Sequence, residues 1–180
     1  MEIRDLFRNK IRFEFVEHND SYLDIDMITL NIKNGWKQFM KRNKNKLLKI
    51  LKKVENDRKK GNVILPFPQQ IFNFMRYFSI KKAKVMIIGQ DPYINMEIIK
   101  NKYIKPQAVG LSFSVPDNFP KPPSLKNILN ELKNDLDIDY PSGNLISWVK
   151  EKVILLNSAL TVIKGKSNSH KDYWNNFTDK

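Results

Sequence analysis

The sequence predicts an α/β protein in which a short central parallel sheet lies between two layers of helices. Two short apolar runs, residues 84–88 and 153–157, have the length and composition of strands that are buried on both faces. Around them, apolar residues recur at the three- and four-residue spacing of helices. Because strands that alternate with helices normally pair in parallel, we expect a three-layer α/β/α arrangement.

The remaining elements follow from the same periodicity. Helical spacing is shown by Leu47, Ile50, Leu51 and Val54; by Ile71, Phe74, Met75 and Phe78; by Leu125, Ile128, Leu129, Leu132 and Leu136; and by residues 145–149. A further strand is expected at residues 111–115. Ser124 is expected to cap the helix that follows the proline-rich residues 116–123. We assign residues 33–180 to one domain and residues 1–32 to an N-terminal arm.

The composition favours a polyanionic partner. Lysine and arginine number 32 against 19 acidic residues, a net charge of +13. Such an excess favours nucleic acid, although a genome biased toward lysine, asparagine and isoleucine would produce it without selection for binding. Without cysteine there is no disulfide and no thiolate metal site. No apolar run approaches about 20 residues and no secretory signal is recognisable, so we expect an intracellular protein without a membrane partner.

Three segments that follow predicted strands are candidates for chemistry, because ligands bind beyond the carboxyl ends of parallel strands. Residues 89–93 (GQDPY) place a carboxylate beside backbone amides, which suits the orientation of a water, but they also suit an ordinary turn. Phe113 can stack on a flat base or pack in the core. Asn157 can pair with a pyrimidine edge through its amide, or it can cap its own loop.

Five motifs in one order resemble the family 1 uracil-DNA glycosylases. They are GQDPY at residues 89–93, QAVGLSFSV at 107–115, PPSLKNI at 122–128, LLNSALTV at 155–162, and SNSHK at 167–171 with Trp174 and residues 177–179 after it. The resemblance covers residues 36–180. A single motif is weak, but five in order on matching predicted elements are specific.

The resemblance implies a DNA repair glycosylase that flips uracil out of DNA and hydrolyses its bond to deoxyribose, leaving an abasic site. Asp91 would position the attacking water and stabilise the sugar cation. Gln90 would help to hold the uracil through the loop backbone, and Tyr93 would exclude the 5-methyl group of thymine. Phe113 would stack on the base, and Asn157 would read its edge and reject cytosine. This electrostatic task needs no metal and no cofactor.

The resemblance also implies contacts outside the base pocket. Pro122, Pro123 and Ser124 would press on the DNA backbone. The partner is therefore uracil-containing DNA, and the chain is expected to act as a monomer; a replication-protein partner stays unidentified.

Three features depart from the family pattern. Ile94 follows the tyrosine where the family usually has a histidine that supports the water and the loop. Residues 94–106 are longer than the family loop, and they would reshape the pocket mouth or bind a partner. The closing His-Pro-Ser-Pro segment does not occur, so its uracil-stabilising histidine, its apolar wedge and the last strand are expected to be missing. The histidines are His18 and His170, and His170 aligns with the Ser-His block instead.

These departures leave two interpretations open. The first is a monofunctional uracil-DNA glycosylase, favoured by the complete set of pocket residues. The second is a catalytically weak or inactive DNA-binding or replication scaffold on the same fold, favoured by the missing histidine and wedge. A truncated sheet is also expected to leave residues 153–157 as an uncovered apolar edge.

Overall fold

The computed structural model describes residues 21–99, 103–117 and 119–179. Most of the predicted N-terminal arm, with His18, lies outside the described residues. The helices are α2 (Ile25–Ile28), α3 (Asn34–Arg42), α4 (Lys44–Lys59), α5 (Pro123–Leu136), α6 (Ile146–Lys150) and α7 (Lys171–Thr178), with the 3₁₀ turns η1 (Pro68–Gln70), η2 (Asn73–Met75) and η3 (Ile80–Lys82). The strands are β1 (Ile64–Leu65), β2 (Val85–Gly89), β3 (Met96–Ile99), β4 (Tyr103–Pro106), β5 (Val153–Asn157) and β6 (Val162–Ile163).

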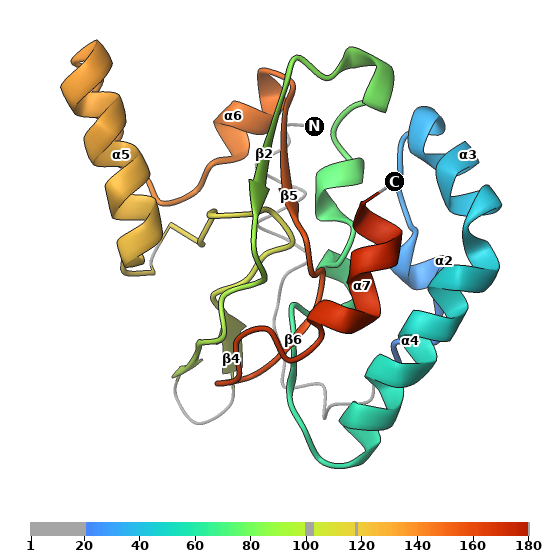
Figure 1. Cartoon of the computed structure of the whole chain (residues 1–180). Coiled ribbons are helices and arrows are strands. Elements are labelled where there is room, and N and C mark those ends of the chain that lie inside the picture. The colour runs from blue at the N-terminus through green and yellow to red at the C-terminus, as the bar shows by residue number, and fades with distance from the viewer. Residues whose placement is uncertain (1–20, 100–102, 118, 180) are drawn as a thin grey trace.

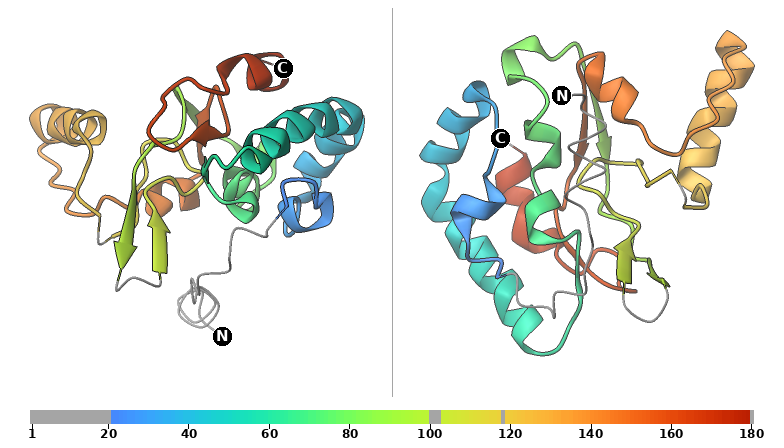
Figure 2. Two further views of the ribbon diagram at one scale, coloured as in Figure 1. Left: turned by 90° about the horizontal axis from the view of Figure 1, so that it is seen from below. Right: turned by 180° about the vertical axis from the view of Figure 1, so that it is seen from behind.

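A parallel strand pair forms the centre of the molecule. β2 and β5 run side by side in a register from Val85 opposite Val153 to Gly89 opposite Asn157. Figure 1 shows α3, α4 and α7 on one side of this pair and α5 and α6 on the other, and the view from behind in Figure 2 agrees. The α/β prediction is confirmed. The antiparallel pairs β1–β6 and β3–β4 lie toward the carboxyl ends of the central strands.

The longest helix, α4, buries the apolar residues that the sequence spacing predicts. Leu47, Leu51 and Val54 of α4 are buried and face the core, as the spacing predicts. Gly61 follows the helix with φ of +88°, a conformation that glycine adopts without steric cost. The α4 stripe packs toward α7 and β1, so the lysine-rich outer face is left to solvent.

Residues 71–78 depart from the predicted helix. Ile71, Phe72, Phe74 and Met75 are all at most 3% exposed. So many nearly consecutive apolar side chains exceed what one face of a helix can turn inward, and the segment forms short 3₁₀ turns instead. Phe72 packs against Trp174 and Phe177 at ring-centroid distances of 6.2 Å, which joins this segment to α7.

Two predictions around the proline-rich loop are wrong. Residues 111–115 form no strand, because Phe113 has φ of +62°, which is incompatible with extended backbone. Ser124 does not cap α5: the cap position is Pro122, and Pro123 begins the helix. The Ser124 hydroxyl lies 3.0 Å from the Tyr93 hydroxyl instead.

The exposed edge of the sheet is not where the sequence predicts it. β5 is mostly buried, with Ile154 and Leu155 each 1% exposed. β2 was expected to be buried, but Val85, Met86 and Ile88 are 52%, 46% and 59% exposed. Within the described residues β2 pairs with β5 alone, so one edge of an apolar strand is left uncovered. Such an open apolar edge favours pairing with another strand.

Candidate active site

Most of the predicted site residues surround one pocket at the carboxyl ends of β2 and β5. Its volume is about 260 Å³. The pocket is lined by Gly89, Gln90, Asp91, Pro92, Tyr93, Ile94, Ala108, Val109, Gly110, Leu111, Phe113, Ser124, Asn157 and Ser167. Parallel strands bring the residues after β2 and the residue at the end of β5 to the same edge, as the strand pattern predicts.

Asn157 is the most informative polar group in the pocket. It is 9% exposed, and within the described part of the chain its side-chain amide forms no hydrogen bond. A strand-end cap would bond its own loop, so this arrangement favours ligand binding over the capping interpretation. Gly89 lies opposite Asn157 and makes room for it, because a Cβ at position 89 would lie 2.4 Å from Asn157 Oδ1.

Asp91 is held by the loop that follows β6. Its Oδ2 atom accepts hydrogen bonds from the Ser167 hydroxyl at 2.9 Å and from the Asn168 backbone N–H at 2.7 Å. Its Oδ1 atom has only a long contact, 3.4 Å, with Gln90 Nε2. One carboxylate oxygen is therefore fixed in place while the other remains available to a ligand or a water.

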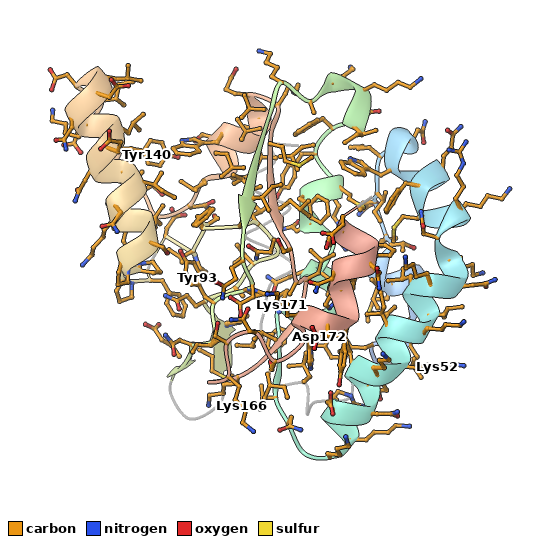
Figure 3. The ribbon with its side chains drawn as sticks, viewed as in Figure 1. Lys52, Tyr93, Tyr140, Lys166, Lys171 and Asp172 are labelled. Carbon is orange, nitrogen blue, oxygen red and sulfur yellow. The ribbon has the colours of Figure 1, made fainter. Side chains whose placement is uncertain are left out.

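Tyr93 connects the pocket wall to the start of α5. Its hydroxyl lies 3.0 Å from Ser124 Oγ and donates a 3.3 Å hydrogen bond to the Phe113 carbonyl. Burial raises the pKa of Tyr93, and the hydrogen bond with Ser124 partly opposes this, so the phenol stays neutral. Figure 3 shows Tyr93 between the end of β2 and α5. Both contacts fix the hydroxyl end of the ring, which forms part of the pocket wall.

Backbone hydrogen bonds make the loops around the pocket one unit. The carbonyls of Gly89 and Gln90 accept from the N–H groups of Ser158 and Ala159 at 2.9 and 3.0 Å. The Ile94 carbonyl accepts from Gly165 N–H at 3.0 Å. The loop after β2 is therefore tied to both loops that follow β5 and β6, which gives the pocket residues a fixed geometry.

The Phe113 segment is fixed from both sides. Ser112 N–H donates to the Leu155 carbonyl at 3.2 Å, which holds the segment against β5. Gly110 adopts φ of +72°, and a Cβ there would lie 1.7 Å from the Gln70 carbonyl oxygen. Only glycine allows that close approach, so the bend that places Phe113 depends on it.

The structure brings most of the predicted residues together but not all of them. Pro122 and Pro123 are not among the residues that line the pocket, and they form the start of α5. His170 lies in the core, fully buried, with Nδ1 2.8 Å from the Thr161 hydroxyl. Ile94 lines the pocket as an apolar residue. The long segment that it begins contains the β3–β4 hairpin, which pairs Met96 with Pro106 beside the pocket mouth.

Sequence reasoning missed Ser167 and Asn168 as partners of Asp91. They lie 76 and 77 residues farther along the chain, and only their place in a matching motif hinted at a role. Among the described residues, no group of acidic or histidine side chains could hold a metal ion. No helix in the described ranges is long and apolar enough to cross a membrane.

Comparison with known proteins gives consistent similarities, although no family model matches the chain. The chain is 42% identical over 161 residues to a uracil-DNA glycosylase of Campylobacter jejuni (strain RM1221), covering 87% of this chain and 65% of that protein. It is 47% identical over 130 residues to a uracil-DNA glycosylase of Blochmanniella floridana, covering 71% of this chain and 55% of that protein.

A solved structure shows the same fold. The crystal structure of mimivirus uracil-DNA glycosylase superposes with a TM-score of 0.73 at 33% identity, covering 84% of this chain and 55% of that chain. The chain therefore has a uracil-DNA glycosylase fold over the aligned residues. It spans about half to two thirds of the length of the curated relatives it matches.

Proposed function

We propose that this chain belongs to the family 1 uracil-DNA glycosylases and excises uracil from DNA by hydrolysing the bond between the base and deoxyribose. The observation that carries the proposal is the unpaired amide of Asn157, which lies in one pocket with Asp91, Tyr93 and Phe113. Sequence identity of 40–47% to curated uracil-DNA glycosylases supports the same assignment.

Base recognition follows from the pocket's donors, acceptors and walls. A flipped uracil presents one carbonyl acceptor and one N–H donor on the edge that Asn157 faces, and a side-chain amide satisfies both. Phe113 supplies a flat apolar face for stacking. The fixed ring of Tyr93 occupies the space that a 5-methyl group would need, so thymine is excluded.

Bond cleavage rests on Asp91. Because Ser167 and Asn168 bind Oδ2, the Oδ1 atom is left to orient a water toward the sugar. The water's hydroxyl adds to the anomeric carbon, its proton is released to solvent or to the departing base, and uracil leaves. The carboxylate also stabilises the positive charge that develops on the sugar. Gln90 assists through the loop backbone.

DNA binding uses surfaces next to the pocket. Pro122, Pro123 and Ser124 contact the DNA backbone where α5 begins, and the hydrogen bond between Ser124 and Tyr93 links this contact to the pocket wall. The net charge of +13 attracts the polyanion. The protein acts on uracil-containing DNA as a monomer.

The open edge of β2 is the place where the family sheet would continue. The relatives are longer than the part that this chain matches, and β2 exposes an apolar edge with no strand beside it in the described residues. We propose that the strand with which the family sheet closes, followed by its His-Pro-Ser-Pro segment, would pair at that edge. Among the described residues, the pocket lining contains no histidine.

A second candidate function is a DNA-binding scaffold with little or no catalysis, because no histidine is among the described residues that line the pocket. Loss of one electrostatic stabiliser costs on the order of 10²–10³ in rate. The first candidate nevertheless explains why Asp91 and Asn157 are both kept in productive positions, which a scaffold does not need.

The test is release of uracil from a labelled uracil-containing oligonucleotide, measured with DNA binding on the same samples. The glycosylase proposal expects abasic-site formation that Asp91→Asn suppresses while DNA binding is retained. DNA binding without any release, unchanged after a His-Pro-Ser-Pro tail is added, would establish the scaffold instead.

A further inference from the structure

A second hollow lies at the opposite end of β2 and β5. It encloses about 630 Å³, within the range of small-ligand sites, and is lined by Asn31, Ile32, Lys33, Asn34, Lys37, Tyr77, Phe78, Ser79, Lys82 and Lys152. Lys152 precedes β5 whereas Asn157 ends it, so one strand length, about 15 Å, separates the hollow from the uracil pocket. In Figure 1 these are the upper and lower ends of the strand pair.

The charged residues of the lining are all basic. In the part of the chain that the structure describes, it holds four lysines and no acidic residue, together with neutral polar, aliphatic and aromatic side chains. The side chains of Lys33, Lys37 and Lys82 form no ion pair and no hydrogen bond within the described part of the chain. By contrast, Lys60 and Lys133 pair with acidic neighbours on their own segments. Like charges converging on one concave surface raise its affinity for anions.

The fourth lysine is placed by an unfavourable backbone conformation. Lys152 has φ of +72°, which costs a residue with a side chain about 1–2 kcal/mol. Its ammonium group lies 5.6 Å from the Phe78 ring centroid and donates to the Lys150 carbonyl at 2.9 Å. Asn31, which also lines the hollow, has a positive φ as well, of 64°. Both residues come shortly after the end of a helix, α6 for Lys152 and α2 for Asn31, where the left-handed conformation commonly ends a helix.

The rigid floor of the hollow comes from the core. Phe78 is 4% exposed, and its carbonyl accepts a 3.0 Å hydrogen bond from the Trp36 indole. Lys33 N–H donates to the Met75 carbonyl at 3.1 Å, which fixes the start of α3 against the same segment. Phe78 is buried beneath the Lys152 ammonium, so its ring is not offered to a ligand.

We propose that this hollow is a phosphate-binding site. Ammonium groups bind phosphate oxygens as point charges, and the neutral donors of Asn31, Asn34 and Ser79 add hydrogen bonds. The phosphate groups would belong either to a free polyphosphate or to the backbone of a second DNA segment. A second segment is needed because the pocket lined by Asn157 lies one strand length away from this hollow.

The test compares two variants of the whole chain that lose the same charge. The site variant carries Lys33→Gln, Lys37→Gln and Lys82→Gln. The matched control carries Lys49→Gln, Lys52→Gln and Lys59→Gln on the exposed face of α4, where Figure 3 shows Lys52 pointing away from the body. The probe is inorganic tripolyphosphate, titrated by calorimetry. The single change Lys82→Gln is measured as well, since one exposed substitution is the least disturbing to folding.

We expect saturable binding of tripolyphosphate by the wild-type chain. The affinity should fall at least tenfold in the site variant and measurably in Lys82→Gln, and it should not change in the control. A uracil-free oligonucleotide that displaces tripolyphosphate identifies the backbone as the natural source, and failure to displace it identifies a free polyphosphate. The proposal is overturned if tripolyphosphate does not saturate, or if both triple variants weaken equally. Neither result depends on uracil release, so the site stands or fails separately from the proposed function.

Discussion

Gly89 and Asn157 are register partners across β2 and β5, and a methyl group added at position 89 would lie 2.4 Å from Asn157 Oδ1. The glycine therefore leaves the space in which the Asn157 amide lies. The same Cβ would lie 3.4 Å from Phe113 Cε2, so both predicted base contacts pack on one glycine.

Gly89→Ala is expected to impair the pocket more than the fold. The added methyl group must displace the Asn157 amide, which weakens uracil binding at least tenfold. The matched control is Gly61→Ala, where a Cβ meets nothing within 4 Å and only the backbone conformation, about 1 kcal/mol, opposes the change. Thermal unfolding and uracil affinity are measured for both. Unchanged affinity in Gly89→Ala would show that Asn157 does not bind the base.

The pair of hydrogen bonds to Asp91 Oδ2 predicts a graded effect on rate. Asp91→Asn removes the negative charge and is expected to lower single-turnover uracil release by about 10²–10³-fold. Ser167→Ala keeps the charge and the Asn168 N–H bond, so about tenfold is expected from the lost charge-assisted bond. Equal rates for wild type and Ser167→Ala would mean that Ser167 does not position Asp91.

Tyr93 allows the ring and the hydroxyl to be separated. Tyr93→Phe keeps the wall of the pocket and loses the bonds to Ser124 and Phe113, so uracil remains preferred over thymine although release slows. Tyr93→Ala removes the wall, and thymine release is expected to rise relative to uracil release. Oligonucleotides with a single uracil or thymine measure the ratio. If the ratio of thymine release to uracil release in Tyr93→Ala equals the wild-type ratio, Tyr93 does not determine specificity.

His170 predicts a pH dependence of stability outside the pocket. Burial lowers the pKa of His170 below its ordinary value of 6.5, and the nearby carboxylate of Asp57, with Oδ2 3.5 Å from Nε2, only partly opposes this. The folded protein therefore holds a neutral imidazole, while the unfolded chain binds a proton near the ordinary pKa. The unfolded state binds more protons in that range, so the free energy of unfolding falls as the pH drops below about 6.5.

Thermal unfolding midpoints between about pH 7.5 and pH 5 check this slope. His170→Gln is expected to be less stable than the wild type at neutral pH. Its stability should also depend less on pH, because the contribution of His170 to that dependence is lost. Glu55 and Asp57 have lowered pKa values, so their contributions are lost only below their ordinary values of 4.5 and 3.8. If the unfolding midpoint depends on pH equally in His170→Gln and in the wild type, the imidazole of His170 is not held neutral by burial.

The sequence predicted the parts of the site that local pattern encodes. The end of β5 at Asn157 and the turn at residues 89–93 follow from apolar runs that end in polar residues, and parallel pairing brings them together. The bond between Asp91 and Asn168 was not predictable in this way, because it joins loops 77 residues apart. The exposure of β2 also escaped prediction, since an apolar run has the same sequence whether or not a neighbour covers it.

The most direct test of the central claim is titration with free uracil, observed at the Asn157 side-chain amide by NMR. This measurement detects uracil binding without requiring catalysis. The account predicts that uracil shifts the Asn157 amide resonances, that thymine and cytosine do not, and that Asn157→Ala abolishes the response of the remaining pocket residues. If uracil leaves the Asn157 amide unchanged while the protein is folded, this pocket is not a uracil site.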